Sequence, residues 1–156
     1  MTISCLQGGK TIAQLSGGTK TNLEIQKILY FANVFYIGKN GNKEPLVDRN
    51  FLTWRFGPAV KHLYDHIKKF GNGKVPVSAF DDIADIMNEK EEPLKGFERE
   101  VNVIKKAYER YKKYPAHKLV AISHWEGGAW AATIGKGEEV ISNTAIWNEY
   151  NDRYGN

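Results

Sequence analysis

Two histidines four residues apart offer the first chemistry in the sequence. His62 and His66 follow a helical spacing, so their imidazoles would share one face and reach the same metal ion. The residue after His62 is Leu63, where a zinc-protease motif carries its glutamate, and no cysteine or acidic cluster supplies a third ligand. We therefore predict no metal site here, and two exposed histidines beside the apolar stripe of a helix.

The other residue types that catalyse reactions have no supporting motif around them. His117 and His124 lack a nucleophile nearby in the sequence, Cys5 lies in a glycine-rich N-terminal stretch, and Ser123 is not part of a nucleophile elbow. The glycine pairs match neither a phosphate-binding loop nor a dinucleotide fingerprint. We predict no catalytic residue, no cofactor and no enzymatic activity. An enzyme built on His124, Glu126 and a spatial neighbour is the alternative.

A basic segment interleaved with tyrosines is the main signal for a nucleic-acid partner. The chain carries 22 basic and 18 acidic residues, so the formal charge of +4 is a mild excess. Aromatic and basic side chains together bind single-stranded nucleic acid in some proteins. However, Tyr108 and Tyr111 lie on an apolar seam and the basic residues lie off it, which favours a solvated helix face and makes nucleic acid an unlikely partner. The basic residues are Lys105, Lys106, Arg110, Lys112, Lys113 and Lys118.

The segment Trp54–Pro58 indicates a protein-binding surface. Trp54 and Phe56 bracket Arg55, and tryptophan and arginine are favoured anchors of protein interfaces. The alternative is that Trp54 packs onto the central helix while Arg55 pairs with an acidic side chain. Composition alone favours this packing role.

A central helix positions these residues. Thr21 and Glu24 form a capping-box pattern, so a helix should begin here. The residues that follow are apolar on most sides of a helix, which indicates a buried element. Gln26 and Lys27 are the polar exceptions. At 156 residues the chain fits one domain with its own core.

The rest of the chain predicts shorter elements around that helix. Residues 45–47 and 51–56 have the pattern of two extended segments, and Gly57-Pro58 is typical of a helix start. Ser78 is a candidate N-cap of a short amphipathic helix. A long helix carries Phe97, Val101, Ile104, Tyr108 and Tyr111 as its seam, and a final helix starts near Asn143 with Ser142 or Asn143 as its cap.

These elements predict a mainly α fold with a small β element (α+β). We expect a single compact domain of five to six helices around a buried central helix 21–37, plus a short two-stranded piece near 45–56. Residues 1–20 should form a loosely ordered N-terminal lead-in, and residues 21–156 the helical domain.

The sequence also bears on location. Cys5 is the single cysteine and cannot form an internal disulfide, which favours a reducing compartment. The longest apolar run is too short for a membrane span, and residues 1–20 have no apolar block like that of a signal peptide. We expect a cytoplasmic protein without a membrane partner.

In order and spacing, three stretches resemble the Panacea domain, the SocA/GepA-like group of bacterial and phage-associated antitoxins. Leu23–Ala32 is similar to that group's Leu-x-x-Gln-Lys-Leu-Leu-Tyr-Phe-Ala, and Trp54–Val60 to its Trp-Arg-Tyr-Gly-Pro-Val-Val. Ser123-His124 ahead of Trp130 is similar to its Ser/Thr-His before Pro-Trp, with Ala129 in place of the proline. The likeness covers about residues 21 to 150.

The resemblance implies an antitoxin of a toxin–antitoxin system, which neutralises a cognate protein toxin by direct binding. The toxin would be encoded by an adjacent gene. Alternatives are an adaptor that presents a bound client to a protease, a nucleic-acid-binding regulator, and a hydrolase. Ten residues match the family patterns and are expected to bind the partner or hold the fold: Gln26, Lys27, Tyr30, Trp54, Arg55, Gly57, Pro58, Tyr64, His124 and Trp130.

Overall fold

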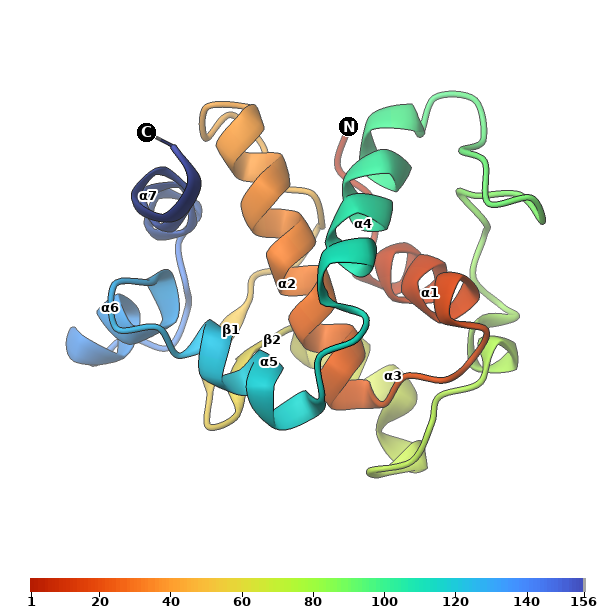
Figure 1. Ribbon diagram of the computed structural model, residues 1–156, viewed down its shortest axis with the longest axis horizontal. Coiled ribbons are helices and arrows are strands. Elements are labelled where there is room, and N and C mark those ends of the chain that lie inside the picture. The colour runs from red at the N-terminus through yellow and green to blue at the C-terminus, as the bar shows by residue number, and fades with distance from the viewer. Residues whose placement is uncertain (156) are drawn as a thin grey trace.

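Helix α2 (Asn22–Lys39) runs through the middle of the molecule, with α4 and α7 packed along it on either side (Figure 1). The structure is a computed structural model, and it describes residues 1–155. The capping box is present, because the Thr21 side chain accepts a hydrogen bond from the backbone of Glu24 and the Glu24 carboxylate accepts one from that of Thr21. Every residue from 25 to 37 is buried. The buried central helix is therefore confirmed.

The fold class is confirmed as mainly α with a small two-stranded element. Residues 1–155 contain seven α-helices, more than expected, because two stretches without a clear helical pattern also fold as helices. The strands β1 and β2 pair antiparallel, with Trp54 opposite Gly57. The other elements are α1 (Cys5–Ser16), β1 (Leu52–Trp54), β2 (Gly57–Ala59), α3 (Lys61–Ile67), α4 (Glu98–Tyr111), α5 (Ala116–Ser123), α6 (Ala129–Gly135) and α7 (Asn143–Tyr154), with 3-10 turns at Lys68–Phe70 and Val77–Phe80.

Aromatic side chains join α2 to its neighbours. The rings of Phe31 and Tyr111 stack with centroids 4.3 Å apart, which fixes α4 against α2, and Tyr30 meets Phe51 edge-on at 5.2 Å. Val101, Ile104, Tyr108 and Tyr111 are buried along α4, which confirms the predicted seam from Val101 onward. Phe97 is the N-cap before the helix and is only partly buried. The cap of α7 is Ser142, whose hydroxyl accepts a hydrogen bond from the backbone of Ala145 at 3.1 Å.

The prediction of a loosely ordered lead-in is wrong. Helix α1 begins at a capping box between Ser4 and Gln7 and lies against α2. Its glycines are close-packing positions: a Cβ on Gly8 or Gly9 would come within 2.7 Å of a leucine methyl group on α2 or α3. The high glycine content suggested a flexible backbone for residues 1–20. In the structure, the absence of side chains at these glycines lets the helices approach each other closely.

The predicted hairpin is displaced along the chain. The strands occupy residues 52–54 and 57–59, so Gly57 and Pro58 belong to β2 and the next helix begins at Lys61. Gly57 has φ +102°, which lies outside the helical region. Proline suits the first turn of a helix, but it is also tolerated on an edge strand, where its position needs no N–H donor. Val47 instead pairs with Ile3 in an isolated parallel bridge.

The short helix expected after Ser78 is also wrong. Val77–Phe80 is a 3-10 turn, and the residues after it up to Met87 adopt turns and irregular backbone. Phe80 and Met87 are nevertheless buried as the apolar pattern predicted. Helical spacing of apolar residues over so short a segment therefore located the core contacts but not the backbone conformation.

Candidate functional site

Gln26 and Lys27 of α2 cover the outer edge of strand β2. Gln26 exchanges two hydrogen bonds with the backbone of Val60, donating from Nε2 at 3.0 Å and accepting at Oε1 at 2.9 Å. The Lys27 ammonium donates to the carbonyl of Pro58 at 2.9 Å. An edge strand exposes unpaired backbone groups, and these two side chains satisfy them in place of a third strand. The hairpin is thereby fixed to the central helix.

Lys27 reaches this edge through the protein interior. Its side chain is buried, and the desolvation that follows lowers the pKa of its ammonium to about 7. Gly57 makes the approach possible, because a Cβ there would contact the Ser123 hydroxyl and lie 2.7 Å from Lys27 Cε. The Gly57-Pro58 pair therefore supplies both the space and the carbonyl that Lys27 requires.

Tyr30 joins α2 to α6 and α7. Its hydroxyl donates to Oε1 of Glu149 at 2.7 Å, and the backbone N–H of Ala129 donates to the same oxygen at 2.9 Å. Burial raises the pKa of Tyr30 well above its ordinary value, so the hydroxyl remains a donor. Glu149 is 2% exposed. Sequence reasoning missed it, since one glutamate on a mixed helix looks like a surface residue.

His124 and Trp130 support the far side of the hairpin. Their rings stack with centroids 3.8 Å apart, and the Trp130 indole N–H donates to the backbone carbonyl of Trp54 at 2.9 Å. Partial burial, together with the nearby charge of Lys27, lowers the pKa of His124, while the backbone of Arg55 acts in the opposite direction. The third family motif thus contacts the second, and Ala129 in place of proline leaves this contact intact.

The tip of the hairpin, formed by Arg55 and Phe56, projects into solvent. The Phe56 side chain is 59% exposed, and the Arg55 guanidinium lies 5.6 Å from the centre of its ring. Below the tip, Trp54 meets the half-exposed Tyr64 edge-on at 5.1 Å. Trp54 thus packs against Tyr64 of α3. Arg55 is exposed and forms no ion pair with an acidic side chain of the described residues, so that part of the alternative is wrong.

A groove of about 660 Å³ runs beside the tip, between the hairpin, the start of α2 and the end of α3. Its lining combines apolar and aromatic side chains with the cationic groups of Arg55 and Lys68, and it includes no carboxylate from the described residues. We call the tip and this groove together the hairpin site. The lining residues are Asn22, Leu23, Gln26, Lys27, Trp54, Arg55, Phe56, Gly57, Ala59, Tyr64, Lys68, Gly71 and Asn72.

The polar groups beneath the hairpin site make structural hydrogen bonds. Ser123 Oγ donates to the carbonyl of Val120 at 2.8 Å, and the one bond from the Lys27 ammonium goes to a backbone carbonyl. In the part of the chain that the structure covers, the His124 Nε2 atom has no hydrogen-bond partner. These contacts describe a scaffold that holds the hairpin in place.

The two candidate metal ligands lie in different environments. His62 is exposed, as predicted, but His66 is partly buried, with Nε2 2.9 Å from the carbonyl oxygen of Ala79 and its ring stacked on Phe80. The expectation that both are exposed is therefore wrong for His66. Across residues 1–155, no three His, Cys, Asp or Glu side chains gather where they could hold an ion.

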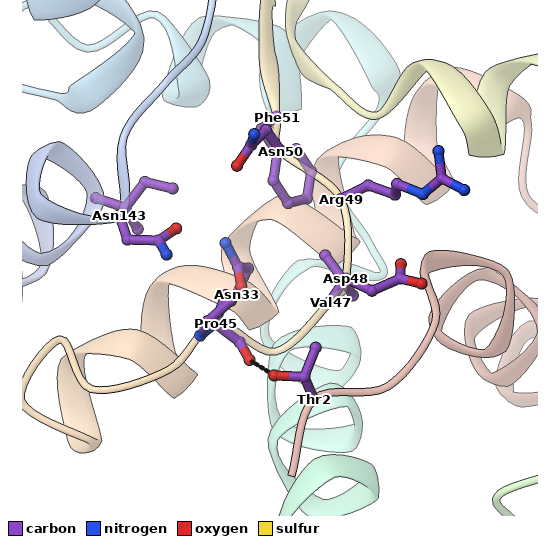
Figure 2. A pocket seen from close by; sticks show the side chains of 10 residues that line it. Thr2, Asn33, Pro45, Val47, Asp48, Arg49, Asn50, Phe51 and Asn143 are labelled. Atoms are coloured by element: carbon purple, nitrogen blue, oxygen red, sulfur yellow. Dashed lines mark hydrogen bonds between the residues drawn. The ribbon is translucent and has the colours of Figure 1, made fainter.

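A second cavity, of about 270 Å³, lies between the 45–51 segment, α2 and the start of α7 (Figure 2). Asn33 Oδ1 accepts a hydrogen bond from the backbone of Leu46 at 2.9 Å, and Figure 2 shows the Asn33 amide nitrogen pointing into the cavity. The Asn143 side chain also points inward, whereas that of Arg49 points away. None of the ten family-motif residues lines this cavity, so it is separate from the hairpin site.

Two lysines of the basic segment are engaged by neighbouring groups. Lys112 pairs with Glu109 at 2.9 Å, and Lys105 donates to the backbone carbonyl of Glu91 at 2.9 Å.

Among helices within the described residues, none has the length and apolar content needed to cross a bilayer.

The fold and the hairpin site define a mainly helical domain with one short hairpin held against its central helix. This chain belongs to the antitoxin SocA-like Panacea domain family, whose model matches residues 25–131. That range includes all ten family-motif residues, and the resemblance drawn from the sequence is confirmed. No curated protein and no solved structure matches the chain significantly.

Proposed function

We propose that this protein is an antitoxin that neutralises a cognate protein toxin by binding it at the hairpin site. The proposal places its action in the cytoplasm and needs no catalytic step. The observation that carries it is the combination of a firmly held hairpin and an exposed tip. Family membership supports the antitoxin role, and the geometry suggests which surface performs it.

The hairpin tip has the composition of an interface anchor. Exposed aromatic and arginine side chains account for much of the binding energy at protein interfaces. Phe56 and Arg55 stand next to a groove whose walls include Trp54 and Tyr64, so one partner could cover a continuous apolar surface. Burial of that surface would supply the driving force, and Arg55 would add orientation.

The hydrogen bonds below the tip favour tight binding. Gln26, Lys27 and Trp130 hold the hairpin backbone at both edges before any partner arrives. A surface that is already ordered loses less conformational entropy on association than a flexible loop does. Most family-motif residues would therefore act by positioning the tip, while Arg55 and Phe56 would touch the toxin.

Co-expression with the neighbouring open reading frame tests the proposal. We expect the neighbouring product to stop growth, this protein to relieve the toxicity, and the two proteins to elute as one complex from a sizing column. The F56A and R55A variants should lose affinity by at least about tenfold with unchanged thermal unfolding, as expected for hot-spot residues. The matched control is I134A, which removes a side chain that is 43% exposed on α6.

Two outcomes would overturn this assignment. If F56A and R55A neutralise and bind as well as the wild type, the hairpin site is not the docking surface. If the toxin disappears faster when this protein is present, and only when a protease is active, the protein is an adaptor that presents the toxin for degradation.

A further inference from the structure

A second positively charged hollow lies at the opposite end of α2 from the hairpin site. It occupies about 360 Å³ between the C-terminal end of α2 and the first turns of α4, at the upper ends of both helices in Figure 1. Its lining includes three cations and, among residues 1–155, no carboxylate. The lining residues are Tyr36, Lys39, Asn40, Arg99, Asn102, Val103 and Lys106.

Aromatic rings and a hydrogen bond hold the cations over this hollow. The Arg99 guanidinium donates to the Asn40 side-chain oxygen and lies 5.5 Å from the centre of the Tyr36 ring. The Lys106 ammonium lies 5.7 Å from the centre of the Phe35 ring. Arg99 and Lys106 belong to α4 and Lys39 to the last turn of α2, so both helices contribute cations to the lining.

Two ammonium groups of the same charge lie close together in this hollow. The Lys39 and Lys106 ammonium groups are close enough that Lys106 is the largest cause lowering the pKa of Lys39. No carboxylate of the described chain forms an ion pair with either lysine, whereas Lys112 pairs with Glu109. Two neighbouring ammonium groups repel each other, and a bound anion between them would remove that repulsion.

Two carboxylates that contact Tyr36 are engaged by other groups. The Tyr36 hydroxyl donates to Glu100 at 2.8 Å and lies 3.2 Å from a Glu44 carboxylate oxygen, and both carboxylates contact the Met1 ammonium. Arg99 is also near enough to Glu44 to help lower its pKa. Lys39 and Lys106 have no such neighbour, so the hollow keeps an excess of positive charge.

We propose that this hollow binds a small anion that carries two or more linked phosphate groups. Linked phosphates present several acceptor oxygens, which matches two ammonium groups and a forked guanidinium better than a single carboxylate would. The volume suits a small ligand, whereas a nucleic-acid strand requires an extended basic track. This site lies apart from the hairpin site, so the inference does not depend on the proposed toxin.

Calorimetric titration of the full chain with sodium pyrophosphate tests this inference. We expect saturable binding that sodium sulfate at the same ionic strength does not reproduce. The K39M and K106M variants, which change exposed side chains, should each weaken binding by at least about tenfold, the scale of a lost charge-assisted contact. The control is K113M, which removes an exposed lysine just beyond the other end of α4 and should bind pyrophosphate as the wild type does.

The outcomes separate cleanly. The inference is wrong if the wild type does not bind pyrophosphate. It is also wrong if K39M and K113M lose the same affinity, because the anion would then be attracted by the overall positive charge of the protein and not by the hollow. Titration with a single-stranded oligonucleotide gives a further arm. If the oligonucleotide binds, K39M and K106M weaken its binding, and pyrophosphate does not compete with it, the hollow is part of a nucleic-acid surface and the small-anion assignment is wrong.

Discussion

The indole nitrogen of Trp130 donates a hydrogen bond to the backbone carbonyl of Trp54, across 2.9 Å between residues 76 positions apart in the chain. This bond joins the start of α6 to the strand that leads into the hairpin tip. Together with Lys27 and Gln26 on the opposite edge, it holds a hairpin of two three-residue strands that would be marginal by itself.

Removing this bond should loosen the hairpin. We expect W130F to lower the free energy of unfolding by about 1 kcal/mol, because a phenyl ring retains an aromatic face for His124 but donates no hydrogen bond. Amide exchange at Thr53 and Trp54 should accelerate. Urea denaturation and hydrogen exchange measure both effects. W147F serves as the control, since Trp147 is partly buried on α7, and equal exchange rates in both variants would contradict the assignment.

Glu149 should be one of the most sensitive positions in the core. E149A removes the acceptor of both Tyr30 and the Ala129 N–H, so two buried donors lose their partner, and we expect a loss of about 3 kcal/mol in the free energy of unfolding. E149Q keeps an oxygen at the same place and should lose about 1 kcal/mol. Chemical denaturation of both variants measures these losses in the free energy of unfolding. Similar losses for the two would mean that the negative charge matters more than the acceptor.

Gly57 should not tolerate even a methyl group. G57A combines a positive φ with contact against Ser123 and Lys27, and we expect it to lose at least about 2 kcal/mol more than G41A in the free energy of unfolding. Gly41 is the matched control because it has φ +63° with nothing within 4 Å of its Cβ position. Thermal or urea unfolding compares them, and equal losses would show that backbone strain alone is responsible.

Lys27 should make stability depend on pH. Its folded pKa of about 7 lies below the ordinary 10.5, so between these values the unfolded chain binds more protons than the folded one. The free energy of unfolding therefore rises with pH across this window, with a slope of up to about 1.4 kcal/mol per pH unit. Below pH 7 the charged ammonium is buried and that stability is absent.

Comparison with K27M isolates this contribution from other titrating groups. Methionine has a similar length and no proton to exchange, so the wild type should gain stability relative to K27M from about pH 7 to pH 9. Urea denaturation in a series of buffers measures the difference. Parallel curves for the two proteins would show that the Lys27 pKa is not lowered by burial.

Local patterns in the sequence were sufficient where the interaction itself is local. The Thr21–Glu24 capping box spans four residues, and it predicted the start of α2 correctly. Gln26 and Lys27 were recognised as exceptions on an apolar helix, but their role was not, because their partners are backbone atoms of Val60 and Pro58 more than thirty residues away. Hydrogen bonds to distant backbone leave no spacing pattern in a sequence.

Ambiguous residues account for the errors. Proline at residue 58 suits a helix start and a strand edge equally well, and only the covering side chains of α2 select the strand. Gly8 and Gly9 suit both a flexible segment and a close helix contact, and the leucines they touch lie on other elements. Glu149 was missed because a buried carboxylate is recognisable only by its partners.

The contacts of α1 set the smallest piece of this chain that should fold alone. The family model begins at residue 25, yet Gly8 and Gly9 lie against Leu29 and Leu63 inside the matched range. A protein trimmed to residues 25–131 would expose those leucines to water. It would also lack Glu149, the hydrogen-bond acceptor of Tyr30. We expect such a fragment to aggregate, so a truncated version of this protein should retain the flanking helices together with the matched segment.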